Sequence, residues 1–359
     1  MAPGFAETCR AAGPARRDLA TVRLVSVAQG TPAVSVVIPN YQGRDVLPVT
    51  LDALEIALAA TPIACEVIVV DDASRDGSPE LVERERPNVR LIRKPRQEGF
   101  GPTCNLGVSE ARAPLVYLLN SDVSVHPGFL APLVAQLGEP DCFAAVSLNL
   151  GSDGRVRPPH VVAPRLRRGQ IRLSGIDLDP LWRSKRLEQA EPLETLFGIG
   201  GSMLVRRDRF LALGGFADVF APYYYEDTDL GWRAWRRGWR TLLAPGSVVT
   251  HRDGGSISTT QQRRRVKVIR KRNRFLLVWR NLIDERTFRR EHLWRLPGYL
   301  SGSLLRGDTT VVAGFEAALR RRRGLAAHRQ RERSEAALSD AEIFARLEAV
   351  RARLVAGGT

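Results

Sequence analysis

Acidic and amide side chains follow two apolar runs of the sequence. Asp71 and Asp72 come directly after CEVIVV, and Asn120 and Asp122 follow LVYLL. Ligands of parallel α/β sheets bind outside the carboxyl ends of the strands. A carboxylate there can accept a hydrogen bond from a base or ribose, or hold a Mg²⁺ ion whose other ligands are diphosphate oxygens. Each group alone is also typical of a turn.

A second acidic group, EDTD, begins at Glu226 and follows three tyrosines. Acids in the first turn of a helix complement its dipole, which is the structural interpretation. The functional interpretation is that the tyrosine rings wall a pocket and raise the pKa of a carboxyl group toward that of a general base. His251 follows the apolar run SVVT and is either an ordinary polar residue or a metal ligand. The stripe Trp232, Trp235 and Trp239 has helical spacing, which favours core packing.

The elements that carry these residues alternate in type along the first half of the chain. Uninterrupted apolar, β-branched runs predict buried strands, and leucines spaced three and four apart predict helices between them. We expect strands at 34–39, 65–70, 89–94 and 115–120 and helices at 47–58, 78–86 and 103–112. This alternation predicts a doubly wound, mostly parallel α/β sheet.

The domain organisation follows from composition and periodicity. Residues 1–30 predict a mostly unstructured leader, residues 31–260 a catalytic domain with a variable insertion at 151–192, and residues 261–359 a basic helical C-terminal region. In the catalytic domain, order is expected to return at 196–206, with helices at 208–213 and 226–237 and strands at 241–243 and 248–251.

Composition excludes some functional classes. The 359 residues are 44% hydrophobic and 26% charged, which excludes disorder throughout. The net charge is +15, yet residues 261–359 hold 24 Lys and Arg against 10 Asp and Glu, so the rest is almost neutral. Four cysteines without metal-ligand spacing indicate free thiols in a reducing compartment. No apolar run is long enough to span a bilayer, so we expect a cytoplasmic protein that is peripheral, if anything, on the inner face of the plasma membrane.

Two segments of the C-terminal region each allow two interpretations. Residues 263–283 combine a basic face with apolar residues, which predicts either a solvated helix packed on the catalytic domain or a segment drawn to an anionic membrane surface. Ser339 to Glu342 form a capping box that opens a last helix. The apolar side of that helix, which includes Ile343 and Leu347, predicts a docking surface or a homodimer contact.

Six blocks in one order resemble an inverting glycosyltransferase of family 2 with the GT-A fold, in its rhamnosyltransferase-like bacterial branch. The resemblance covers roughly residues 34–256. The blocks are VSVVIPNY, EVIVVDDASRDGS, QEGFGPTCNLGVSEARAPLVYLLNSDV, GIGGSMLVRRDRFLALGGF, YYYEDTDLGWRAWRRGWR and PGSVVTHRDGGS.

The resemblance implies a nucleotide-sugar donor that carries UDP, dTDP or GDP. Pro39 and Tyr41 would flank the nucleotide, and Asp72 would hydrogen-bond its base. The acceptor would be a saccharide or a lipid-linked saccharide, as in the synthesis of cell-surface polysaccharide or glycolipid.

The resemblance also implies the chemistry. Asp122 would be the metal ligand of the D-x-D motif, His251 a further ligand, and Mg²⁺ or Mn²⁺ the cofactor. Asp227 of the E-D motif would be the base that deprotonates an acceptor hydroxyl for a single displacement with inversion. The first D-x-D position is Asn120 in this sequence, which removes one negative charge from the metal site.

Two other classes of function fit parts of the sequence. One is a nucleic-acid-binding protein with a basic arm. The charge of the C-terminal region favours this function, but the acids at the strand ends would repel a phosphate backbone. We therefore expect no nucleic acid as a partner. The other is a catalytically inactive scaffold of the same fold, which Asn120 makes worth testing.

Overall fold

The computed structural model describes residues 31–356 except 158–159, 188–189, 200 and 253–259. The expected leader at residues 1–30 and Cys9 therefore lie outside the described residues. The other three cysteines are free thiols, as the sequence predicts. Among the described residues, no helix is both long and apolar enough to cross a membrane.

Four parallel strands form the first half of the central sheet, in the order β3-β2-β1-β4. The order reverses between β1 and β4, which is where such sheets bind ligands. This part confirms the predicted doubly wound α/β sheet. The strands are β1 (Val34–Asn40), β2 (Cys65–Asp71), β3 (Val89–Arg93) and β4 (Leu115–Leu119), and the connecting helices are α1 (Leu47–Ala59), α2 (Ser78–Glu85) and α3 (Phe100–Glu110).

The second half of the sheet is mixed. β10 (Ser202–Arg206) runs antiparallel between β4 and β6 (Cys142–Gly151), and β11 (Arg240–His251) lies parallel to β6. The two strands expected at 241–243 and 248–251 are one strand, β11, with a register shift between Ala244 and Val248. Two short strands, β5 (Val123–Val125) and β9 (Leu193–Thr195), pair antiparallel with β11. The carboxyl ends of β1, β2, β4, β6 and β11 consequently share one edge of the sheet.

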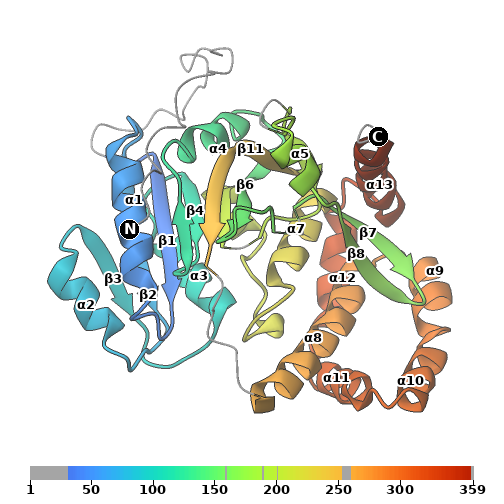
Figure 1. The fold of residues 1–359 in the computed structure, drawn as a ribbon. Helices are drawn as coiled ribbons and strands as arrows, with labels where there is room; N and C mark the ends of the chain where they lie inside the picture. The colour runs from blue at the N-terminus through green and yellow to red at the C-terminus, as the bar shows by residue number, and fades with distance from the viewer. Residues whose placement is uncertain (1–30, 158–159, 188–189, 200, 253–259, 357–359) are drawn as a thin grey trace.

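Helices cover both faces of the sheet because the strands are buried on both sides (Figure 1). On one face, Val36 and Ile38 pack against the leucines of α1 and against α4 (Leu130–Gln136). On the other face, Val37 packs with residues of α3, α6 (Arg207–Ala212) and α7 (Glu226–Arg236). These layers hold the strand ends in fixed positions.

The segment expected as a variable insertion at 151–192 contains regular structure. β7 (Val162–Arg167) and β8 (Gln170–Gly175) form an antiparallel hairpin, and a short helix, α5 (Asp179–Arg183), follows. The two residues that join the strands, Arg168 and Gly169, both have positive φ, the conformation of tight hairpin turns.

The C-terminal region is helical, as predicted, and shares a hydrophobic cluster with the body of the protein. Phe275, Leu277 and Trp279 of α8 pack with Trp232 and Trp235 of α7, which confirms core packing for these two tryptophans. The apolar side of α8 is thus occupied by protein, as the interpretation of a helix packed on the catalytic domain predicts. The helices are α8 (Thr260–Asn281), α9 (Glu285–Thr287), η3 (Phe288–Leu293), α10 (Leu296–Leu305), α11 (Thr309–Arg320), α12 (Leu325–Ser334) and α13 (Asp340–Ala356).

The last helix, α13, begins with the predicted capping box. The Ser339 hydroxyl donates to Glu342 Oε2 at 2.7 Å, and Glu342 N donates back to Ser339 Oγ at 3.3 Å. Ile343 and Leu347 are buried in the cluster that contains β7 and α8. The apolar side of α13 therefore docks on its own chain.

Candidate active site

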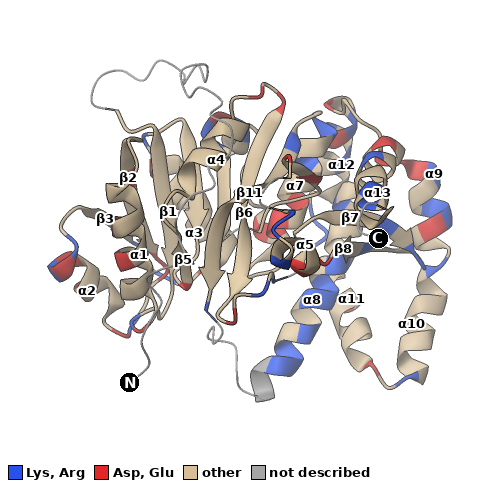
Figure 2. Cartoon of the chain, turned by 45° about the horizontal axis from the view of Figure 1, so that its top comes forward, with Lys and Arg blue, Asp and Glu red and all other residues tan. Residues whose placement is uncertain are grey.

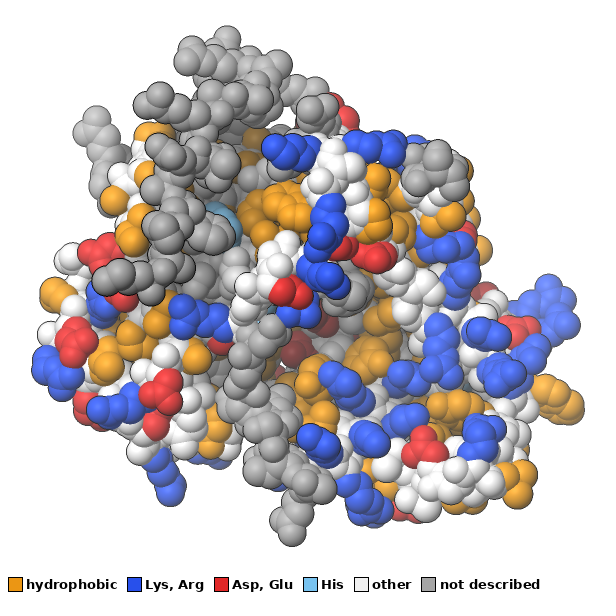
Figure 3. Space-filling model, viewed as in Figure 1, with side chains coloured by type: hydrophobic (Ala, Val, Ile, Leu, Met, Phe, Trp, Pro, Cys, Tyr) orange, Lys and Arg blue, Asp and Glu red, His pale blue; other side chains and the backbone are white. Residues whose placement is uncertain are grey.

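The sheet topology brings three of the predicted site residues to one edge. Asp72 follows β2, Asp122 lies between β4 and β5, and His251 ends β11. These positions share the carboxyl edge because β2, β4 and β11 point the same way. Figure 3 shows acidic side chains recessed near the middle of the face that is viewed.

Asp122 and His251 lie closest together. The antiparallel pairing of β5 with β11 sets His251 opposite Val123, and Arg252 N donates to Asp122 O at 3.1 Å. The distance from His251 Nε2 to Asp122 Oδ1 is 3.6 Å. His251 Nδ1 lies 3.0 Å from Arg252 O, and since a carbonyl only accepts, this contact places the ring proton on Nδ1. The lone pair of neutral His251 is then on Nε2, on the side of Asp122.

Asn120 occupies the first D-x-D position beside this pair. Its Oδ1 atom is buried and accepts no hydrogen bond from the described residues. The side chain lies over Gly201, where an added Cβ would come within 2.3 Å of Asn120 Cγ. Because Gly201 has no side chain, the Asn120 amide fits beside it. The oxygen of this amide has no hydrogen-bond donor among the described residues.

Asp72 is buried and held by three donors. Lys94 Nζ donates to Oδ1 at 2.7 Å, Glu98 N to Oδ1 at 2.9 Å and Gly99 N to Oδ2 at 2.7 Å. Lys94, which is 7% exposed, also donates to Thr103 Oγ1 at 3.1 Å. From the sequence, Lys94 is predicted only as a strand end, because nothing local shows that its ammonium group reaches the end of β2.

The residues after β1 frame the same edge. Pro39 is half-buried at the end of the strand, and Tyr41 is 42% exposed. The amide of Asn40 donates to Asp71 Oδ1 at 2.8 Å and to Ser78 Oγ at 2.9 Å, which joins the ends of β1 and β2 to the start of α2. Asp71 is thus used within the turn, whereas Tyr41 is open to a ligand.

Asp227 lies in the first turn of α7, after a backbone in an unusual conformation. Tyr224 and Tyr225 both have φ of 76°, a region that non-glycine residues adopt only when the surroundings hold them there. The Asn273 amide on α8 holds them by donating to Tyr223 O at 3.0 Å and Tyr224 O at 2.8 Å. Sequence reasoning missed Asn273, whose only local signal is an amide inside a basic helix.

A close backbone contact joins this turn to the Asp72 loop. Phe100 N donates to Pro222 O at 3.1 Å, and a Cβ on Gly99 would lie 2.6 Å from Pro222 O. Burial raises the pKa of the Cys104 thiol on α3, and the charges of Glu226 and Asp72 raise it further while that of Lys94 lowers it. The structure therefore brings the E-D motif and Asp72 to one side of the molecule, as a common active site requires.

Glu226, rather than its neighbour, shows the raised pKa that the sequence analysis expects for a carboxyl group here. Burial, and next the negative charge of Asp227, raise the pKa of Glu226 to about 8. Its Oε2 atom has no hydrogen-bond partner among the described residues. At pH 7 the raised pKa favours the neutral form of Glu226.

The substitution Glu226→Gln is expected to stabilise the protein more at pH 8 than at pH 5. Ionising Glu226 costs more in the folded protein than in the unfolded chain, so wild-type stability falls as the pH rises from 4.5 toward 8. The amide cannot ionise and removes this loss. Melting temperatures of both proteins at the two pH values measure the effect, and an equal difference at both would contradict the raised pKa.

Comparisons with known proteins identify the family of the chain. The model of glycosyl transferase family 2 matches residues 35–214. The N-acetylglucosaminyl-diphospho-decaprenol L-rhamnosyltransferase of Mycobacterium tuberculosis is 32% identical over 237 residues, which are 58% of this chain and 76% of that protein. The succinoglycan biosynthesis protein ExoO of Rhizobium meliloti is 34% identical over 158 residues, 43% of this chain and 44% of that protein.

A solved structure shows the same fold. The crystal structure of GalNAc-T7 with UDP, GalNAc and Mn²⁺ superposes with a TM-score of 0.54 at 20% identity, over 72% of this chain and 49% of that chain. This chain thus spans about half of the solved one, and the match supports the GT-A architecture. With half of its length matched by the family model and a curated relative at 32% identity, the chain belongs to glycosyl transferase family 2.

Proposed function

We propose that this glycosyltransferase moves a sugar from a nucleotide-diphosphate donor to an acceptor hydroxyl in one inverting, metal-assisted displacement. The observation that carries the proposal is the approach of Asp122 Oδ1 and His251 Nε2 to 3.6 Å at the carboxyl edge of the sheet. One of these atoms comes from the turn between β4 and β5 and the other from the end of β11, far apart in the sequence. The pairing of β5 with β11 holds the two together, so the pair is preorganised.

The donor atoms at this place fit a divalent cation. Asp122 supplies a carboxylate oxygen and His251 a ring nitrogen, and Asn120, two residues before Asp122, has a buried amide oxygen without a partner among the described residues. Mg²⁺ and Mn²⁺ bind such oxygen ligands and take further ones from phosphates. When bound, the cation would offset the negative charge that develops on the leaving diphosphate. The Mn²⁺ in the GalNAc-T7 structure supports this choice.

Asp72 and Tyr41 suit the nucleotide. A carboxylate has about four acceptor positions, and Oδ2 of Asp72 accepts one bond from the described residues, that of Gly99 N. It can accept another from an N–H of the base, while the hydrogen bond from Lys94 holds the carboxylate in place. Pro39 and Tyr41 would flank the nucleotide at the end of β1.

Asp227 would act as the base. Thr228 N donates to Asp227 Oδ1 at 2.6 Å, which orients the carboxylate, and neutral Glu226 beside it leaves the proton-accepting role to Asp227. The Asn273 contacts hold the turn before it. The acceptor hydroxyl would approach the sugar from this side, opposite the diphosphate, and lose its proton to Asp227 as the new bond forms.

The relatives guide the choice of acceptor. The mycobacterial relative is named for a lipid-diphosphate saccharide and the rhizobial one for succinoglycan, a saccharide polymer. We propose that the acceptor is a saccharide or, as the name of the mycobacterial relative suggests, a lipid-linked saccharide. We propose that the donor carries UDP, dTDP or GDP. The enzyme would act in the cytoplasm, at the inner face of the plasma membrane.

A thermal-shift panel of nucleotide sugars, with and without Mg²⁺ or Mn²⁺, tests the proposal. One donor is expected to stabilise the folded protein by about 2.7 kcal/mol at 100 times its Kd, and so to raise the melting temperature. The shift should depend on the cation in the wild type and not in His251→Ala. Incubation of that donor with candidate acceptors should then give a product of inverted anomeric configuration by NMR.

Two results would overturn the proposal. The first is a set of melting temperatures that no nucleotide sugar changes, together with steeply salt-dependent binding of DNA or RNA, which would favour the nucleic-acid function. The second is donor binding without hydrolysis or transfer in the presence of Mn²⁺, which would favour the scaffold.

A further inference from the structure

An uncharged helix with exposed apolar residues lies at the outer edge of the C-terminal region. α10 (Leu296–Leu305) contains no charged side chain and has a single buried residue. Trp294 just before it is 85% exposed and Leu305 at its end is 89% exposed. Leu293 and Leu304 are 45% and 53% exposed. Leu293 ends η3 and Trp294 lies in the short turn before α10, while Leu304 and Leu305 end α10. Exposed apolar side chains therefore lie at both ends of this segment. Large apolar side chains that gather on an exposed segment often mark an interaction site.

A basic side chain follows the C-terminal end of α10. Arg306, the residue after Leu305, is exposed. Lys271 of α8 also lies near this end, where it pairs with Asp308 at 3.3 Å. Figure 2 shows α10 itself as uncharged.

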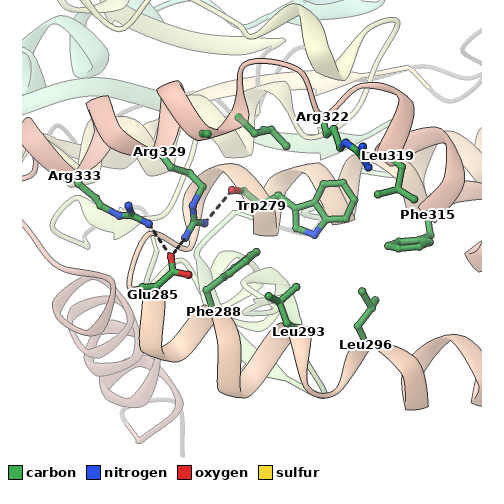
Figure 4. A pocket seen from close by; sticks show the side chains of 12 residues that line it. Trp279, Glu285, Phe288, Leu293, Leu296, Phe315, Leu319, Arg322, Arg329 and Arg333 are labelled. Carbon is green, nitrogen blue, oxygen red and sulfur yellow. Dashed lines mark hydrogen bonds and ion pairs between the residues drawn. The ribbon is translucent and has the colours of Figure 1, made fainter.

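An apolar groove with an arginine rim lies at the other end. Its volume is about 650 Å³, and Leu293 and Leu296 face Phe315, Leu319 and Arg322 across it (Figure 4). The Arg322 side chain is exposed within the run Arg320 to Arg323, and no described residue accepts a hydrogen bond from its guanidinium. Its charge is thus available to an anion outside the protein.

We propose that α10 and its flanks dock on an anionic phospholipid bilayer. We call this face, Leu293 to Leu305 with Arg306 and Arg322, the docking face. Trp294 and Leu305 would enter the boundary between headgroups and acyl chains, where Trp is favoured. The arginines at both ends would meet lipid phosphates, each attracted by the negative surface potential. The groove between α10 and α11 can take the end of one acyl chain.

Co-sedimentation of the full chain with lipid vesicles tests the docking. The wild type is expected to bind vesicles of phosphatidylglycerol and phosphatidylcholine, less at high salt, and phosphatidylcholine alone only weakly. The double variant W294E/L305E should lower the partition coefficient roughly tenfold or more, because two apolar side chains become charged. Both residues are exposed, so the melting temperature should not change. Ile56→Glu, at a 65% exposed apolar residue of α1, is the matched control and should bind as the wild type does.

Three outcomes would overturn the proposal. They are equal binding of W294E/L305E and the wild type, absence of wild-type binding to anionic vesicles, and equal binding of neutral and anionic vesicles. A wild-type dimer in lipid-free ultracentrifugation that W294E/L305E converts to a monomer would assign this face to a second copy of the chain instead. None of these measurements uses transferase activity, so their failure leaves the proposed function standing.

Discussion

The Asp227→Asn variant is expected to lose transfer by a factor of about 10² to 10⁴ in kcat, while its Kd for the nucleotide-sugar donor stays within about twofold. The amide keeps the shape of the side chain but cannot accept the acceptor's proton. Its carbonyl can still receive the hydrogen bond that Thr228 N gives to Asp227 at 2.6 Å, so the helix start should be preserved. Initial rates give kcat, and calorimetric titration gives the donor Kd.

A matched substitution separates the proton transfer from a general charge effect. Asp218 lies on the 3-10 turn η2 (Asp218–Phe220), nine residues before Asp227, and its side chain is exposed. Asp218→Asn removes a carboxylate of the same shape from the same segment and should turn over as the wild type does. A wild-type kcat in Asp227→Asn would remove Asp227 from the mechanism and leave the E-D motif a structural helix start.

The strand-end residues were predictable because local patterns locate the ends of strands. Apolar runs end just before Asp72 and Asp122, and the parallel topology that such runs predict brings their ends to one edge. The pairing of β5 with β11, which sets Asp122 against His251, was not predictable from periodicity, because β5 has three residues. The resemblance to family 2 supplied that link.

The residues that position the site were missed because their roles depend on contacts over long sequence distances. Lys94, at the end of β3, reaches Asp72 at the end of the neighbouring strand β2. Asn273 reaches Tyr224 from a helix that the sequence shows only as basic. The raised pKa of Glu226 likewise depends on how deeply α7 is buried. The hairpin of β7 and β8 escaped notice because its turn, Arg168-Gly169, lacks the Asn-Gly or Asp-Gly pattern.

A buried ionic cluster under the E-D motif should dominate the stability of the site. Asp229 is fully buried and accepts from Arg233 Nε at 2.8 Å, Arg280 Nε at 3.0 Å and Asn281 Nδ2 at 2.8 Å. Burial opposes its ionisation, yet the charges of Arg280 and Arg233 prevail and hold the pKa of Asp229 well below its usual range. The cluster joins the first turns of α7 to the end of α8.

Asp229→Ala is expected to lower the free energy of unfolding by about 3–5 kcal/mol, since it leaves two buried guanidinium groups without their carboxylate. The control is Glu110→Ala, which breaks an exposed pair with Arg90 and should cost at most about 1 kcal/mol. Because the pKa of Asp229 is depressed in the folded state, its contribution is present above pH 4 and is lost as the pH falls further. Urea titrations of the wild type and of the milder Asp229→Asn at pH 7 and pH 3 should therefore give a smaller difference at pH 3. Equal differences at both pH values would contradict a stabilising charge on Asp229. They would show that the carbonyls around the arginines stabilise them, and that the position of Asp227 does not depend on the charge of Asp229.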